Sequence, residues 1–217
     1  MRAVIPYKKE NAKSRLSPVL SREEREQFVE FMLKDVIWCL KEAGVKDIDI
    51  LTTSKYDALY ELGVNFVLDE RDLNDSVNNY LKKTDQPVLI IMADVPLTRP
   101  KHIKEIISSE EDVVIVPGKG GGTNILFIRK PAGFHVCYYG MSFRNHCTIV
   151  KDMKQSLKIY DSFLLSTDID EPQDIVEIIL HGHGFSLKYA LDKFELESGK
   201  ARVKLVNHHE YKSNKGL

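Results

Sequence analysis

Short apolar runs alternate with amphipathic stretches along most of the chain. The apolar runs have the length of strands, and they cover residues 2–6, 48–52, 65–68, 88–92, 113–117 and 124–128. The runs at 88–92 and 113–116 are apolar without interruption, which is typical of strands covered on both faces. Strands that alternate with helices predict an α/β fold of three layers, in which a mainly parallel or mixed sheet carries helices on both faces.

The amphipathic stretches predict the helices between these strands. The longest begins at a capping box formed by Ser21 and Glu24, repeats apolar residues every three or four positions, and ends before Gly44. Further helices are expected at residues 56–62, 75–81, 100–108, 142–153, 172–180 and 188–196. Because ligands bind beyond the carboxyl ends of the strands in such sheets, residues that follow a strand are the first candidates for a functional site.

The pattern becomes weaker after residue 128. A loop is expected over residues 131–140, a late strand over 159–165, a final strand over 203–206 and a frayed tail over 212–217. No internal repeat, low-complexity tract or Pro/Gly-rich linker interrupts the 217 residues. The sequence therefore predicts a single domain that covers residues 1–217.

Composition narrows the class of protein. The chain is 43% hydrophobic and 29% charged, with a formal net charge of −1, so it has no basic excess for nucleic acid or an anionic membrane. No apolar run reaches the ~20 residues of a membrane span, and no signal-peptide pattern precedes the first strand. The three cysteines match neither a disulfide framework nor a zinc site. These features predict a cytoplasmic protein.

Three aspartates stand where strands are expected to end. Asp94 follows the apolar run at 88–92, and Asp168 and Asp170 follow the late strand with one residue between them. Strand ends of this kind can gather three carboxylates at one edge of the sheet. Mg²⁺ prefers oxygen ligands, usually one or two carboxylates together with substrate phosphates. The sequence therefore predicts a magnesium and phosphate site with Asp94, Asp168 and Asp170 as metal ligands.

Three basic residues, Lys8, Lys13 and Arg15, lie in the loop after the first strand. Loops in this position commonly meet the phosphates of a nucleotide, and three cations can neutralise a triphosphate and the pyrophosphate that leaves it. The alternative interpretation is a solvated basic loop, and charge alone does not separate the two.

Two further segments have the features of anion sites. A run of glycines at 120–122 precedes Thr123, and glycines allow successive backbone N–H groups to surround an anion. Gly140 and Ser142 stand at a predicted helix N-terminus, where free N–H groups favour phosphate or carboxylate. The alternatives are a flexible turn in the first case and an ordinary N-cap in the second.

Asn74 and His146 have less specific surroundings. Asn74 opens the helix before the strand at 88–92 and can read a base or ribose, or can cap that helix, which the sequence alone favours. His146 is expected one helical turn after Ser142, on the same face. A single histidine in such a position is more often a packed or surface residue than a catalytic group.

Together these motifs resemble the 2-phospho-L-lactate guanylyltransferase family of coenzyme F420 biosynthesis, over about residues 4–175. The resemblance implies an α/β fold of the nucleotide-diphospho-sugar-transferase type. The matching pieces are Pro6-x-Lys8, Ala12-Lys13-Ser14-Arg15-Leu16, Leu20-Ser21 with Arg25, Asp94-Val95-Pro96, Gly121-Gly122-Thr123-Asn124, Gly140-x-Ser142-Phe143-x-x-His146 and Asp168-Ile169-Asp170-x-Pro172-x-Asp174.

The resemblance also implies an activity. Such enzymes join GTP to a small phosphorylated acid and release pyrophosphate; in the methanogen, archaeal branch the acid is 2-phospho-L-lactate and the product lactyl-2-diphospho-5'-guanosine. Related members use phosphoenolpyruvate. The implied roles are metal binding by Asp94, Asp168 and Asp170, binding of the acceptor phosphate by Thr123, Gly140 and Ser142, and binding of the GTP phosphates by Lys8 and Lys13. Asp75 stands where the family pattern has a small residue, which weakens a guanine-side role for Asn74.

The implied chemistry agrees with the residue types. A phosphate has its second pKa near 6, so the attacking oxygen is already ionised and needs no general base. Lys13 and Asp94 are therefore the candidate catalytic residues, the first for the leaving pyrophosphate and the second for the metal. A glycosyltransferase of the same fold and a non-catalytic nucleotide-binding module remain alternatives. Apolar residues around 134–139 are the candidate contact of a homodimer.

Overall fold

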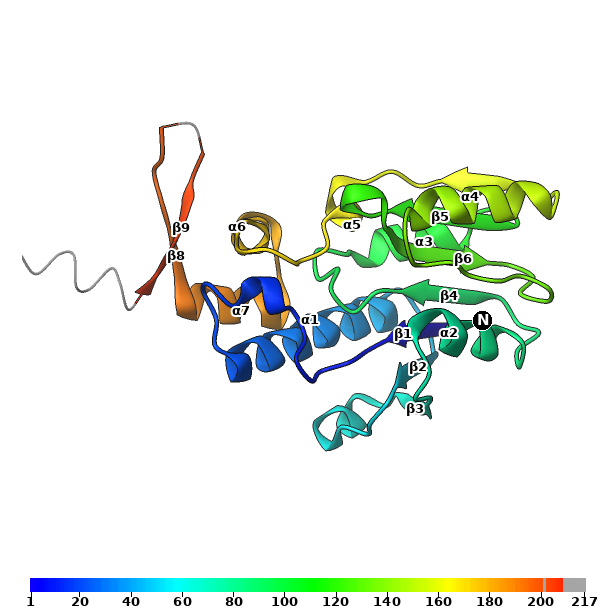
Figure 1. The fold of residues 1–217 in the computed structure, drawn as a ribbon, viewed down its shortest axis with the longest axis horizontal. Coiled ribbons are helices and arrows are strands. Elements are labelled where there is room, and N and C mark those ends of the chain that lie inside the picture. Colours follow the sequence, from blue (N-terminus) through cyan, green and yellow to red (C-terminus); the bar gives the residue numbers. More distant parts are fainter. Residues whose placement is uncertain (201, 209–217) are drawn as a thin grey trace, which may run out of the picture.

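A seven-stranded mixed sheet forms the centre of the computed structural model, which describes residues 1–200 and 202–208 except for the side chains of residues 57 and 58 (Figure 1). The strand order is β3-β2-β1-β4-β6-β5-β7, and only β6 runs antiparallel to its neighbours. The strands are β1 (Arg2–Pro6), β2 (Asp47–Thr52), β3 (Asn65–Leu68), β4 (Val88–Ile91), β5 (Val113–Pro117), β6 (Thr123–Ile128) and β7 (Leu157–Ile159).

Helices cover both faces of the sheet, so the predicted three-layer α/β fold is confirmed. Apolar residues of α1, α3, α6 and α7 join one core cluster, and those of α2 and α4 join the other. The helices are α1 (Arg22–Glu42), α2 (Leu73–Leu81), α3 (Pro100–Ile107), α4 (Ser142–Asp152), α5 (Phe163–Ser166), α6 (Pro172–His181) and α7 (Gly184–Lys193), with the 3-10 helices η1 (Ser14–Leu16), η2 (Asp57–Leu62) and η3 (Lys119–Gly121).

The central strands are buried on both faces, which explains their unbroken apolar runs. In β4, Leu89 and Ile91 enter the α1 side of the core, while Val88 and Ile90 enter the α2 side. All four side chains are fully buried. Each strand residue therefore contributes apolar burial on alternate sides, about 25 cal/mol for each Å² removed from water.

The late strand predicted over residues 159–165 is wrong. Strand β7 ends at Ile159, and α5 begins four residues later with backbone bonds from Leu165 and Ser166 to the Ser162 carbonyl, at 3.1 and 2.8 Å. The hydroxyl of Thr167 donates to the Phe163 carbonyl and closes the same turn. Three consecutive apolar residues fit a short helical turn as well as a strand, and burial of Leu165 decides for the turn.

The last predicted helix, at 188–196, is also wrong in its bounds. Helix α7 begins at Gly184, because Asp35 of α1 accepts hydrogen bonds from the backbone N–H groups of Phe185 and Ser186. Phe194 then opens strand β8 (Phe194–Glu197), which pairs with β9 (Lys204–Asn207) in a separate two-stranded sheet. This hairpin extends away from the main sheet (Figure 1), and the predicted frayed tail at 212–217 lies outside the described residues.

The surface proposed for a homodimer is mostly covered by the chain itself. Phe134 and Val136 are buried in the α2 and α4 cluster, and Tyr139 is exposed. The structural basis expected for that contact is therefore absent at Phe134 and Val136, and the homodimer stays a prediction. Within the described residues, no helix is long and apolar enough to cross a membrane.

Candidate active site

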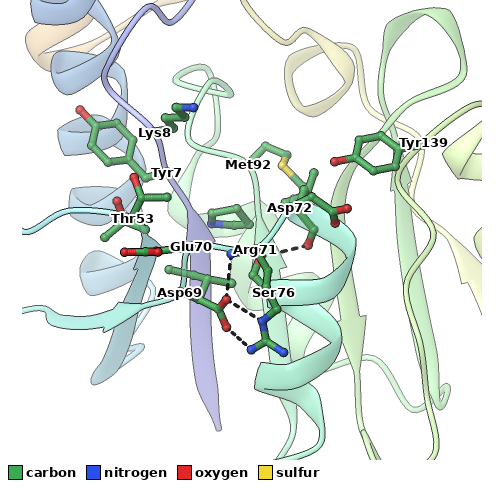
Figure 2. Close-up of a pocket in the computed structure, with 14 residues that line it drawn as sticks. Tyr7, Lys8, Thr53, Asp69, Glu70, Arg71, Asp72, Ser76, Met92 and Tyr139 are labelled. Atoms are coloured by element: carbon green, nitrogen blue, oxygen red, sulfur yellow. Dashed lines mark hydrogen bonds and ion pairs between the residues drawn. The ribbon is translucent and has the colours of Figure 1, made fainter.

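A pocket of about 580 Å³ lies over the carboxyl ends of β1, β2, β3 and β4 (Figure 2). Because these four strands are parallel, the segments that follow them converge on one edge of the sheet. The labelled side chains in Figure 2 come from the segments after these strands, from α2 and from the loop before α4. The lining residues are Pro6, Tyr7, Lys8, Leu51, Thr52, Thr53, Asp69, Glu70, Arg71, Asp72, Leu73, Ser76, Met92 and Tyr139.

The three predicted carboxylates gather beside this pocket. The ammonium of Lys13 donates to Asp94 and, at 2.5 Å, to Asp170, so these two carboxylates meet at one nitrogen atom. The backbone N–H of Ile169 donates to the Asp94 carbonyl at 3.0 Å, which joins the segment after β4 to the segment after α5. The predicted convergence of Asp94 with the Asp168 and Asp170 segment is thus confirmed.

The pKa shifts show opposite environments for the two neighbouring aspartates. Burial raises the pKa of Asp168, and the negative charge of Asp94 raises it further. Burial also opposes ionisation of Asp170, but the charge of Lys13 and its hydrogen bond lower the pKa of Asp170. For Lys13 burial acts to lower the pKa, and the charges of Asp94 and Asp170 raise it overall. Lys13 therefore compensates the charges of Asp94 and Asp170, and the negative charge near Asp168 is less well compensated.

The described part of the chain contains no group of three or more His, Cys, Asp or Glu side chains placed so that it could hold a metal ion. The Lys13 ammonium lies between Asp94 and Asp170, where a metal ion bound by these two carboxylates would lie. Lys13 has a left-handed backbone conformation, with φ 52° and ψ 47°, which costs a non-glycine residue on the order of 1 kcal/mol. The metal assignment stays a prediction: carboxylate oxygens are the donor type that Mg²⁺ prefers, but Lys13 lies between two of them.

The glycine-rich loop closes one side of the carboxylate cluster. The backbone N–H of Lys119 lies 3.4 Å from Asp168 Oδ1, and the Lys119 ammonium pairs with Asp174. Asp174 in turn accepts from the backbone N–H groups of Asp170 and Glu171, at 2.9 and 2.8 Å. Lys119 and Asp174 thus hold the Asp168 to Asp170 segment against the loop.

Thr123 and Ser142 come together as one hydroxyl pair. Thr123 is the first residue of β6, Ser142 is the first residue of α4, and their Oγ atoms lie 3.2 Å apart. Ser142 is not the N-cap, because Met141 occupies that position and the Ser142 side chain contacts Thr123. Gly140 precedes this helix with φ 78°, a conformation that favours glycine. The two segments predicted to bind anions therefore meet at the N-terminus of α4, and their binding of an anion stays a prediction.

The other residues predicted to bind GTP are Lys8, Arg15 and Asn74, and each has different surroundings. Lys8 lines the pocket, and Arg15 lies 3.6 Å from Asp170 Oδ2. Asn74 does not cap α2: Asp72 accepts from Asp75 N at the cap, whereas Asn74 Oδ1 accepts from Tyr138 N at 2.6 Å. This bond spans 64 residues of sequence and could not be seen in the local pattern. It assigns Asn74 to fixing the loop before α4 and not to the pocket wall.

Comparison with known proteins agrees with this arrangement. Residues 1–205 match the family described as guanylyl transferase CofC like. The 2-phospho-L-lactate guanylyltransferase of Methanosarcina mazei is 58% identical over 206 residues, which cover 95% of this chain and 99% of that protein. The enzyme of the same name from Methanococcoides burtonii is 59% identical, covering 94% and 95%.

The chain belongs to the CofC-like guanylyl transferase family. The fold of this guanylyl transferase is similar to that of a candidate nucleotide-diphospho-sugar transferase from Desulfovibrio desulfuricans, with a TM-score of 0.72, 14% identity, and coverage of 88% of this chain and 94% of the other. At this identity the likeness concerns the fold alone, and it confirms the fold type implied by the sequence motifs.

Sequence reasoning missed several residues of this guanylyl transferase that the structure places at the site. Lys119 was visible within the glycine run, and Asp174 within the motif that begins at Asp168, but neither pattern showed their ion pair. Glu70 and Tyr139 line the pocket without any local motif. Their position depends on the order of the parallel strands, which single-sequence patterns do not give.

Proposed function

We propose that this guanylyl transferase joins GTP to 2-phospho-L-lactate, giving lactyl-2-diphospho-5'-guanosine and pyrophosphate. The observation that carries the proposal is the position of the carboxylate cluster, whose Asp94 follows the same strand end as Met92 of the pocket wall. On the other side, the glycine-rich loop that contacts Asp168 leads into Thr123. A nucleotide in the pocket and an anion at Thr123 would place their phosphates at this cluster.

The pocket suits the nucleoside of GTP. Of the carboxylates that line it, Asp69 is paired with Arg71 and bonded to Asn79, and Asp72 caps α2. Glu70 has no hydrogen-bond or ion-pair partner among the described residues. Guanine presents two adjacent donor groups, N1–H and the 2-amino group, which a carboxylate can accept together. We assign Glu70 to this edge of the base.

Basic residues suit the triphosphate. Lys8 lines the pocket, and Lys13 and Arg15 form ion pairs with Asp170 of the carboxylate cluster. Positive groups held in place stabilise charge that develops on a leaving pyrophosphate without reorganising water. Lys13 is the strongest candidate, because two carboxylates already fix its ammonium.

Mg²⁺ is the proposed cofactor, held by Asp94, Asp168 and Asp170. When bound, it would neutralise charge between the two phosphorylated substrates and polarise the phosphoryl oxygens. Burial and the nearby charge of Asp94 raise the pKa of Asp168, and this supports a cation here, because a positive charge favours the ionised carboxylate. Release of the Lys13 ammonium toward the phosphates would accompany such binding.

The hydroxyl pair suits the phosphate of the acceptor. The Thr123 hydroxyl and the N-terminal N–H groups of α4, that of Ser142 among them, offer donors to an anion, and Gly140 leaves the approach open. An ionised phosphate oxygen attacks without a general base, so orientation is the main contribution of these residues. The chain holds the acceptor in line rather than activating it chemically.

The test combines purified protein and Mg²⁺ with each of four nucleoside triphosphates and with 2-phospholactate, phosphoenolpyruvate or phosphoglycerate, and measures pyrophosphate. We expect release with GTP and 2-phospholactate above all other pairs. A preference for phosphoenolpyruvate would overturn the assigned acceptor, and a preference for another nucleotide the role of Glu70. Release of a nucleoside diphosphate would indicate a glycosyltransferase, and binding without any release a non-catalytic module.

A further inference from the structure

His146 lies behind the hydroxyl pair and is fully buried in α4. Both of its ring nitrogens have partners. The backbone N–H of Cys137 donates to Nε2 at 3.0 Å, and Nδ1 lies 2.9 Å from Thr123 Oγ1. The imidazole therefore connects the loop before α4 with the first residue of β6.

The bond from Cys137 fixes the tautomer of His146. A backbone N–H can only donate, so Nε2 must accept and carries no proton. The single proton of the neutral ring is then on Nδ1, which donates to Thr123 Oγ1. Burial, reinforced by His135, lowers the pKa of His146 to about 4, so the ring keeps this neutral form near pH 7.

This donation determines where the Thr123 proton points. Thr123 Oγ1 accepts from His146 Nδ1 and from the Ser142 hydroxyl, which uses both of its lone pairs. Its own proton has no acceptor left inside this triad. A hydroxyl proton that points outward can form a charge-assisted hydrogen bond with a phosphate oxygen.

His146 is not the only anchor of the loop it contacts. Asn78 of α2 bonds to both the N–H and the carbonyl of Val136, at 2.7 and 3.2 Å, and Asn74 accepts from Tyr138 N. The loop is therefore held from α2 on either side of Cys137. A purely structural role would duplicate these bonds, whereas the bond to Thr123 has no substitute among them.

We propose that His146 is a positioning residue, whose Nδ1–H turns the Thr123 hydroxyl proton toward the phosphate of the acceptor. The inference rests on the proposed function, in which the Thr123 hydroxyl and the backbone N–H of Ser142 bind that phosphate. It predicts that His146 affects the use of the phosphorylated acid and leaves the use of GTP almost unchanged.

A matched pair of variants separates the two bonds of the ring. In His146→Asn the amide can replace Nδ1–H toward Thr123 but leaves Cys137 N without its acceptor. In His146→Gln the longer side chain can accept from Cys137 but loses the donor to Thr123. We expect His146→Gln to raise the KM for 2-phospholactate about 10-fold and His146→Asn to raise it less than about 3-fold. The opposite order, or an equal change in the KM for GTP, would overturn the inference.

A double-mutant cycle provides a second readout. Thr123→Val removes the hydroxyl, so adding His146→Gln to it should raise the acceptor KM no further. If the two effects multiply instead, His146 acts by another route and the inference is wrong. Melting temperatures of all variants show whether any change in KM follows from lost folded protein.

The wild-type protein distinguishes failure of this inference from failure of the proposed function. If GTP gives no pyrophosphate with 2-phospholactate, with phosphoenolpyruvate or with phosphoglycerate, the proposed function fails and the inference fails with it. ¹⁵N NMR of the ring, recorded without substrates, should show a protonated Nδ1 and an unprotonated Nε2 near pH 7. A protonated Nε2 in an active enzyme would overturn the inference alone.

Discussion

The buried carboxylate of Asp35 and the half-buried carboxylates beside the pocket show opposite arrangements. Asp35, between α1 and α7, accepts from Phe185 N at 2.7 Å, from Ser186 N at 2.9 Å and from the Ser186 hydroxyl at 2.5 Å. Beside the pocket, by contrast, Asp168 lies 3.4 Å from Lys119 N and is close to the negative charge of Asp94. Carboxylates that are fully bonded within the chain stabilise the fold. Carboxylates left under-compensated are available to a ligand.

Of the substitutions that test this contrast, Asp94→Asn should have the largest effect on activity. The substitution removes a charge at the strand end while keeping the shape of the side chain, and we expect turnover to fall at least about 100-fold. The melting temperature should change little, because the amide oxygen of Asn can still accept from Lys13, which also keeps its bond to Asp170. Pyrophosphate release and thermal unfolding measure the two quantities. Wild-type turnover in this variant would contradict the role assigned to the cluster.

Asp35→Ala should give the reverse result. Three donors at the start of α7 would lose their acceptor, and we expect the free energy of unfolding to fall by about 3 kcal/mol. Activity for each folded molecule should remain close to that of the wild type. Urea unfolding together with activity at low temperature tests both. A stable variant with lost turnover would show that the distinction between the two carboxylate groups is mistaken.

Lys13→Met tests how far the charge of Lys13 controls the ionisation of the carboxylates beside the pocket. The ammonium lowers the pKa of Asp170, so its removal should raise that pKa, which ¹³C NMR of the carboxyl carbons can follow. Asp170 contributes stability above its unfolded pKa and loses it as the pH falls through its lowered folded pKa. In Lys13→Met this loss should therefore begin at higher pH. The KM for GTP should rise about 10-fold, and the KM for the acceptor should rise less.

Glu70→Gln should have the smallest effect, confined to the choice of base. An amide keeps one acceptor but brings a donor toward the donors of guanine, so kcat/KM for GTP should fall about 10-fold while that for ATP stays nearly constant. Glu110→Gln, outside this pocket, is the matched control. An equal loss with both nucleotides would place Glu70 away from the base.

The sequence predicted most of what lies along the strands and less of what lies between them. Asp94 could be found because it follows the buried strand β4 at the ligand edge of the sheet. Asp168 and Asp170 were found from their spacing, although the strand expected before them is the helical turn α5. The bonds of Asp94 and Asp170 to Lys13 could not be found, because they depend on a left-handed backbone conformation at Lys13 and on contacts across 81 and 157 residues.

The errors in the last third of the chain have the same cause. The start of α7 is fixed by Asp35, about 150 residues earlier, and α5 is fixed by the burial of Leu165. Local propensity is a weak guide where tertiary partners satisfy the ends of an element. Mg²⁺, the homodimer and the cytoplasmic location stay predictions of the sequence.

The reversed direction of β6 has a consequence for how this site can change. Pro117 pairs with Thr123 while Val88 pairs with Ile128, so the chain reaches the ligand edge at the end of β5, turns there and enters β6 directly, with no crossover helix. One hairpin thus delivers both the glycine loop and Thr123. Inserting or deleting a residue between Pro117 and Thr123 would shift the acceptor side as a unit and leave the nucleotide side, built on the parallel strands, untouched.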